Sequence, residues 1–143
     1  MMPTAAAIRQ AMAERTLAYR ATNFKRDVPV AERREILRRS RETSAALDSL
    51  QRAARQAFAA ARGWRLSERK RMSAYPVIDH AEVYNKNGRT VAVVTHSYAP
   101  RKDILAYAAR HGLKTEFLSW SWYYPGKCTA VVLTCGGSDE NQK

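Results

Sequence analysis

Asp79 and His96 are the two residues of this chain whose chemistry and expected positions suit a general base. A carboxylate beside an imidazole fixes the tautomer of the ring and raises its basicity. The hydroxyl groups of Ser97 and Tyr98, which follow at once, could supply a nucleophile or a proton donor, as a small hydrolase or nuclease requires. An Asp–His pair is also an ordinary way to satisfy polar groups at a strand end. Because no third orienting group, metal-ligand spacing or phosphate-binding loop accompanies the pair, the structural interpretation is favoured over catalysis.

The segment SWSWYYPGKC, residues 119–128, places four large aromatic side chains in five positions. If residues 114–122 form a strand, Trp120, Trp122 and Tyr124 share one face. That face would be the main core of a small domain, or a surface on which bases stack, as in sheet-based binders of single strands. Trp120 suits the core, and we expect a contact surface for a partner at Trp122, Tyr123 and Tyr124.

The charge of the chain lies in its first half. Lys and Arg number 25 against 13 Asp and Glu, and 18 of the basic residues are Arg. Residues 1–71 carry a net charge of +10, and residues 72–143 carry +2. Such a field attracts polyanions, so the expected partner is nucleic acid or an acidic protein surface. A GC-rich coding bias would also produce an Ala- and Arg-rich chain.

Two groups of basic residues, one near the start of the predicted long helix and one over residues 65–71, are the candidate binding residues. Together they comprise Arg33, Arg34, Arg38, Arg41, Arg65, Arg69, Lys70 and Arg71. The first four lie near the start of a predicted long helix that holds few acidic neighbours, although a charge run is often only a solvated face. Glu35 with Arg39 and Asp48 with Arg52 have the spacing of helical ion pairs.

Two helices are expected to precede the rest of the fold. Pro3 and Thr4 can open a first helix that runs to about Tyr19, and residues 30–62 contain no Gly or Pro. The second helix would be about 50 Å long. Its stripe of apolar and small residues favours a neighbouring helix, either within the chain or in a homodimer: Leu37, Ser44, Leu47, Leu50, Ala54, Ala57, Phe58 and Ala61.

The second half of the chain predicts strands. Asn87-Gly88 lies between two β-rich runs and indicates a two-residue type I′ hairpin. In the resulting register Asp79 lies opposite His96. A helix from residue 101 and strands over 114–122 and 128–135 follow, and residues 64–72 allow one extra short strand. The fold class is therefore α+β: an N-terminal helical pair joined to a small, mostly antiparallel sheet of ββαββ order, its two faces covered by helices.

These patterns divide the chain into a basic helical region (1–62), a small α+β domain (63–135) and a polar tail (136–143). No apolar run is long enough to span a membrane, and no apolar leader begins the chain. Cys128 and Cys135 are too far apart along one strand to pair, so we expect free thiols and a reducing, cytoplasmic location. The spacing of the cysteines and the three histidines matches no zinc site, so neither a metal nor a cofactor is expected.

Three functions remain as hypotheses. The first is a non-enzymatic nucleic-acid-associated protein that grips phosphates with its arginines. The second is a protein-interaction or inhibitor module of phage or plasmid type that acts on a host nucleic-acid machine through an acidic surface. The third is the hydrolase or nuclease built on Asp79 and His96. The first hypothesis predicts that binding to nucleic acid weakens steeply as the salt concentration rises.

Overall fold

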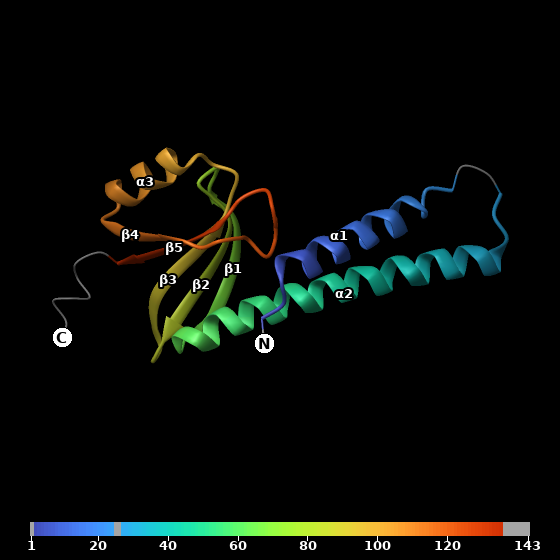
Figure 1. Ribbon diagram of the computed structural model, residues 1–143, viewed down its shortest axis with the longest axis horizontal. Helices are drawn as coiled ribbons and strands as arrows, with labels where there is room; N and C mark the ends of the chain where they lie inside the picture. Colours follow the sequence, from blue (N-terminus) through green and yellow to red (C-terminus); the bar gives the residue numbers. More distant parts are fainter. Residues whose placement is uncertain (1, 25–26, 136–143) are drawn as a thin grey trace. The chain divides into compact units, whose positions relative to one another are not determined.

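The computed structural model describes residues 2–24 and 27–135, so the predicted polar tail lies outside the described residues. The elements in chain order (Figure 1) are α1 Ala5–Arg20, α2 Val30–Arg62, β1 Arg65–Ala74, β2 Ile78–Lys86, β3 Arg89–His96, α3 Arg101–Arg110, β4 Leu113–Phe117 and β5 Ala130–Cys135. The predicted α+β class, with a helical pair before an antiparallel sheet, is confirmed. The chain forms two compact units, residues 1–56 and 57–143, and the boundary between them falls within α2.

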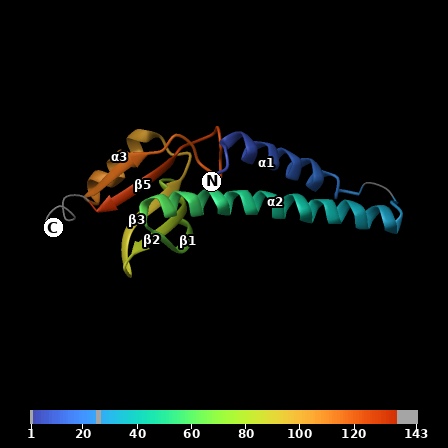
Figure 2. The ribbon, with the colours of Figure 1, turned by 60° about the horizontal axis from the view of Figure 1, so that its bottom comes forward.

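The helical unit contains α1 and most of α2, which run side by side in opposite directions in both views (Figures 1 and 2). Thr4 caps α1, because its hydroxyl oxygen accepts a hydrogen bond from the Ala7 amide (3.1 Å). The bounds of α2 are those expected from the lack of Gly and Pro, and Gly63 follows it with a φ of 70°. In the predicted stripe Leu47 and Ala54 are buried, but Leu37 is exposed, so the stripe is wrong for the first turns of α2.

The sheet has five antiparallel strands in the order β1-β2-β3-β5-β4. The extra strand over 64–72 is confirmed and is the ten-residue edge strand β1, so the order along the chain is βββαββ instead of ββαββ. Asn87 and Gly88 have φ values of 54° and 76°, which confirms the type I′ turn. The last strand, β5, lies between β3 and β4.

The register of the β2–β3 hairpin differs from the prediction by one residue. Lys86 lies opposite Arg89 as expected, but an irregularity between Tyr84 and Asn85 shifts every later pair. His96 is therefore opposite His80, and the predicted pairing of Asp79 with His96 is wrong. Since side chains alternate between faces, the shift also decides which residues His96 meets.

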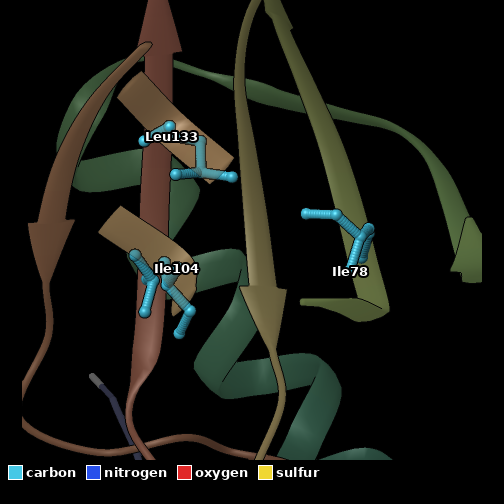
Figure 3. Packing of buried hydrophobic residues seen from close by; sticks show 6 residues of the cluster. Ile78, Ile104 and Leu133 are labelled. Carbon is cyan, nitrogen blue, oxygen red and sulfur yellow. The ribbon is translucent and has the colours of Figure 1, made fainter. Parts of the chain in front are cut away.

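Both faces of the sheet are covered, as predicted. On one face Ile104 and Ala108 of α3 pack in a cluster with residues of the strands, among them Ile78 and Leu133 (Figure 3). On the other face Phe58, from the last turns of α2, contacts Tyr84 at 5.4 Å and Trp122 at 5.4 Å between ring centroids. The sheet is the middle layer of its unit, and the aromatic face lies opposite α3.

The strand predicted over 114–122 ends early. β4 stops at Phe117, and one last bond to β5, from the Leu118 amide to the Ala130 carbonyl (2.8 Å), follows it before the chain leaves the sheet. The segment 118–129 is therefore a loop. Because it lacks the alternation of a strand, Trp122 and Tyr123 can both point toward the aromatic face of the sheet.

Candidate functional site

A buried polar network lies at the centre of the aromatic face. Glu82 is 1% exposed, and its carboxylate accepts four hydrogen bonds. The His96 Nε2 (3.0 Å) and the Tyr84 hydroxyl (3.2 Å) donate to Oε1. The Tyr123 hydroxyl (2.8 Å) and the Trp122 indole (3.3 Å) donate to Oε2. Every lone pair of this carboxylate therefore has a partner, as a buried charge requires.

His96 is held in one tautomer by the other side of the network. Its Nδ1 lies 2.8 Å from the Ser121 hydroxyl oxygen, which also accepts the amides of Tyr123 (3.2 Å) and Tyr124 (3.1 Å). Because the Glu82 carboxylate can only accept, the ring proton of His96 is on Nε2, and Nδ1 faces the Ser121 hydroxyl, whose two lone pairs are filled by the amides. Ser121 thus ties the loop 118–129 to β3.

The electrostatics of Glu82 follow from these contacts. Burial by itself raises the pKa of a carboxyl group, but the hydrogen bonds donated by His96, Tyr123 and Trp122 outweigh it and lower the pKa of Glu82 below its ordinary value. Glu82 is therefore a carboxylate at neutral pH. The network therefore favours the charged form of Glu82.

The contacts of His96 are those of a residue that stabilises the core. The ring is 0% exposed and both nitrogens are occupied, so no substrate can reach it without a rearrangement of the core. The carboxylate beside it is Glu82 and not Asp79, because of the register shift in the hairpin.

The aromatic residues of the loop are mainly core. Trp122 and Tyr123 are buried, so the predicted contact surface is wrong for these two residues, while Tyr124 is half-buried. Trp120, expected in the core, is only half-buried and meets Trp122 edge to face at 6.4 Å. Trp122 and Tyr123 thus serve to enclose Glu82, whereas Trp120 and Tyr124 are partly exposed.

The predicted arginines of α2 are exposed but differ in their partners. Arg38 is bound to both Glu35 and Glu42, so it is neutralised, contrary to the expectation of too few local acids. Its pairing also replaces the predicted Glu35–Arg39 pair, whereas Asp48–Arg52 is confirmed at 2.8 Å.

Three further predicted arginines of α2 have no acidic partner among the described residues. The Arg33 Nε donates to the Val28 carbonyl (2.9 Å), and its guanidinium lies over the Phe24 ring. Among the described residues, no acidic side chain pairs with Arg34 or Arg41. In the described part of the chain, these two are the free cations among the four predicted arginines of α2.

The basic residues of β1 alternate along an edge strand. Arg69 and Arg71 lie on the aromatic face, where Arg69 is 5.4 Å from the Tyr123 ring and the Arg71 Nη2 is 3.2 Å from the His80 Nε2. Lys70 lies on the opposite face and is 3.9 Å from Glu68. Arg65 is exposed at the start of the strand. Charged side chains on an edge strand also prevent pairing with other chains, so this arrangement has a structural role.

Sequence analysis missed Glu82 and Ser121. One signal for Glu82 was present, since it is the single charged residue of the run AEVY, where a buried charge demands several donors nearby. The donors that meet it, Trp122 and Tyr123, are aromatic residues whose pattern in the sequence indicates only apolar rings. Ser121 carries no such signal, because its role depends on the bend of the loop.

No group of His, Cys, Asp or Glu side chains in the described part of the chain could hold a metal ion. Cys128 and Cys135 are free thiols. Within residues 2–24 and 27–135, no helix is both long and apolar enough to cross a bilayer. Comparisons with protein-family models, curated proteins and solved structures found no match to this chain.

Proposed function

We propose that this protein is a non-enzymatic, nucleic-acid-associated protein that binds the phosphate backbone through exposed arginines of α2. The observation that carries the proposal is their spacing. Arg34, Arg38, Arg41 and Arg52 recur at intervals of four, three and eleven residues. At 3.6 residues per turn, these intervals place all four within an arc of about 60° on one side of the helix.

Within the described residues, Arg34 and Arg41 are the arginines of this arc that have no acidic partner, and they lie two turns apart on an exposed helix surface. Their separation is about 10 Å along the axis, which suits contacts with separate phosphates of one strand. Arginine is the side chain whose planar fork best fits a phosphate. Arg38 and Arg52 are already paired with acidic side chains, so they add less positive charge to the arc than Arg34 and Arg41 do.

The environment of His96 in the sheet unit supports a binding role for the protein better than it supports a catalytic role. Among the described residues, the one histidine with a carboxylate at hydrogen-bond distance is buried, and every buried polar side-chain atom around it has a hydrogen-bond partner. The hydrolase hypothesis on Asp79 and His96 would require a substrate to enter that core. Replacement of His96 by Ala tests it, since an unchanged rate of any hydrolytic activity would exclude a catalytic His96.

The test is fluorescence anisotropy of a labelled duplex, titrated with the full chain at about 50 and 200 mM salt. Binding should weaken steeply with salt. The double variant Arg34→Glu and Arg41→Glu should reduce the slope of log affinity against log salt by about two, one for each lost phosphate contact.

The matched control is the double variant Arg39→Glu and Arg110→Glu. Both of these arginines are exposed, and the change in net charge is the same, but Arg39 lies well outside the arc and Arg110 is in α3. An equal loss of affinity in both double variants would mean that only overall charge matters. Absence of binding by the natural chain at the lower salt would overturn the proposal.

A second candidate, the protein-interaction or inhibitor module, is favoured by a different observation. Four large apolar side chains of the helical unit are exposed: Leu17, Tyr19, Val30 and Leu37. Exposed apolar groups beside arginines are typical of interfaces with proteins. This candidate predicts little binding to bare nucleic acid even at low salt. The homodimer through the long helix stays a prediction, and sedimentation equilibrium tests it.

A further inference from the structure

A group of rings and cations lies at the open end of the β2–β3 hairpin, outside the buried network. It consists of His80, Tyr98, Tyr124, Arg69 and Arg71, here called the Tyr98 cluster. Tyr98 and Tyr124 are 4.9 Å apart between ring centroids, and Tyr124 meets His80 edge to face at 5.9 Å. Together with the contact of the Arg71 Nη2 with the His80 Nε2 (3.2 Å), they link residues from β1, β2, the loop 118–129 and the segment after β3.

Tyr98 is the exposed end of the cluster. It is 58% exposed, although it rests on another ring, so an open aromatic surface faces solvent. A ring in this position is available for stacking by any base, because every base has a π-face. Partial burial and the nearby carboxylate of Asp79 raise the pKa of the Tyr124 phenol, so the ring stays neutral at physiological pH.

Arg69 and Arg71 are the charged end. Both are exposed, and each is oriented by a ring: Arg69 by Tyr123, and Arg71 by the His80 Nε2. His80 stacks on Tyr123 at 4.6 Å and 17°. Burial and the nearby positive charges, Arg71 first among them, lower the pKa of His80, so its Nε2 stays an acceptor for Arg71. One of five guanidinium donors is used in this way, and the others remain for a phosphate.

The two ends of the cluster differ in their chemistry. Tyr98 and Tyr124 offer neutral rings at one end, and Arg69 and Arg71 carry positive charge at the other. A ligand with a flat ring at one end and a phosphate at the other matches this arrangement.

We infer that the Tyr98 cluster binds an unpaired nucleotide of a single-stranded nucleic acid, with its base stacked on Tyr98 and its phosphate held by Arg69 and Arg71. The inference rests on the proposed function, because both need a nucleic-acid ligand, but it concerns other residues and an unpaired base instead of a duplex backbone.

The experiment compares affinities of the full chain for one oligonucleotide of about 12 nucleotides, single-stranded or annealed to its complement, by fluorescence anisotropy at about 50 mM salt. Tyr98→Ala should weaken single-strand binding about 5- to 150-fold, as expected for the loss of one stacked base, and leave duplex binding unchanged. Tyr98→Phe keeps the ring and should stay within about twofold of the natural chain. Tyr75→Ala is the control, since Tyr75 is 65% exposed.

The arginine end has a charge-matched control. Arg71→Ala should lower the salt slope of single-strand binding by about one, whereas Arg89→Ala should not. Arg89 is also exposed, but it lies at the hairpin turn, about 23 Å along β3 from the His96 end. Tryptophan fluorescence of each variant verifies that the sheet unit is folded.

The two proposals fail in different ways. If the chain binds duplex through Arg34 and Arg41 but Tyr98→Ala and Tyr75→Ala bind single strands equally well, the inference about the Tyr98 cluster is wrong and the proposed function stands. If single-strand binding depends on Tyr98 but duplex binding is absent, the α2 proposal is wrong. If neither probe binds at the lower salt, both are wrong.

Discussion

Replacement of Glu82 by Gln tests whether the buried network is built around a charge. The amide has nearly the shape of the carboxylate but carries an NH₂ group in place of one oxygen. In either orientation that group faces a donor that cannot accept, the Trp122 indole N–H or the His96 Nε2–H, whereas the tyrosine hydroxyls can turn. One buried donor is left without a partner.

The magnitude follows from these contacts. A buried unsatisfied donor costs about 1 to 3 kcal/mol, and bonds to a charged acceptor are stronger than neutral ones by about 1 kcal/mol. Removal of the charge brings no compensating gain, because the pKa of Glu82 is lowered despite its burial, which means that the site favours the carboxylate. We therefore expect Glu82→Gln to lower the free energy of unfolding of the sheet unit by about 2 to 5 kcal/mol.

Thermal unfolding followed by tryptophan fluorescence measures this change. The chain has three tryptophans, Trp64, Trp120 and Trp122, and all lie in the unit of residues 57–143, so the signal reports that unit. A loss of about 3 kcal/mol corresponds to a fall in Tm of about 12 to 24 °C. Glu116→Gln is the control, because Glu116 is exposed and its ion pair with Arg62 is worth less than about 1 kcal/mol. Equal Tm values for the two variants would refute a structural charge at Glu82.

Three further predictions concern stability and reactivity. Since the folded-state pKa of Glu82 is lowered, its contribution is complete above the unfolded pKa of about 4.3 and is lost as pH falls through the folded value, so the Tm difference between the natural chain and Glu82→Gln should shrink in acid. Gly88→Ala places a side chain at a φ of 76° and should cost about 1 to 2 kcal/mol in the same fluorescence assay; an unchanged Tm would contradict the turn geometry. Burial raises the pKa of Cys128, whereas Cys135 is exposed, so Cys135→Ser should react with a thiol reagent more slowly than Cys128→Ser.

Features fixed by local chemistry were predictable from the sequence. The bounds of α2 follow from the lack of Gly and Pro over residues 30–62, and the hairpin turn follows from Asn87-Gly88, where positive φ is needed at both positions. The class of the fold and the burial of both sheet faces follow from the apolar character of the strands. Each of these depends on a few neighbouring residues.

Features that depend on distant parts of the chain were not predictable. The irregularity at Tyr84 and Asn85 has no local signature, yet it replaces the predicted Asp79–His96 pair by His80–His96. The loop after Phe117 was predicted as a strand because aromatic residues favour strands, but the bonds to Glu82 and to Ser121 outweigh that preference. Likewise Arg38 forms ion pairs with Glu35 and Glu42, although the sequence pattern indicated an unpaired cation at this position.

The position of β5 between β3 and β4 constrains the order of events during synthesis. β3 pairs with β5, more than thirty residues later in the chain, and not with the nearer β4. Until residues 130–135 have left the ribosome, the β2–β3 hairpin has an open edge that carries Val93 and Val94. The nascent chain therefore exposes an aggregation-prone edge until β5 emerges, while its helices can already have formed, since helices need only local contacts.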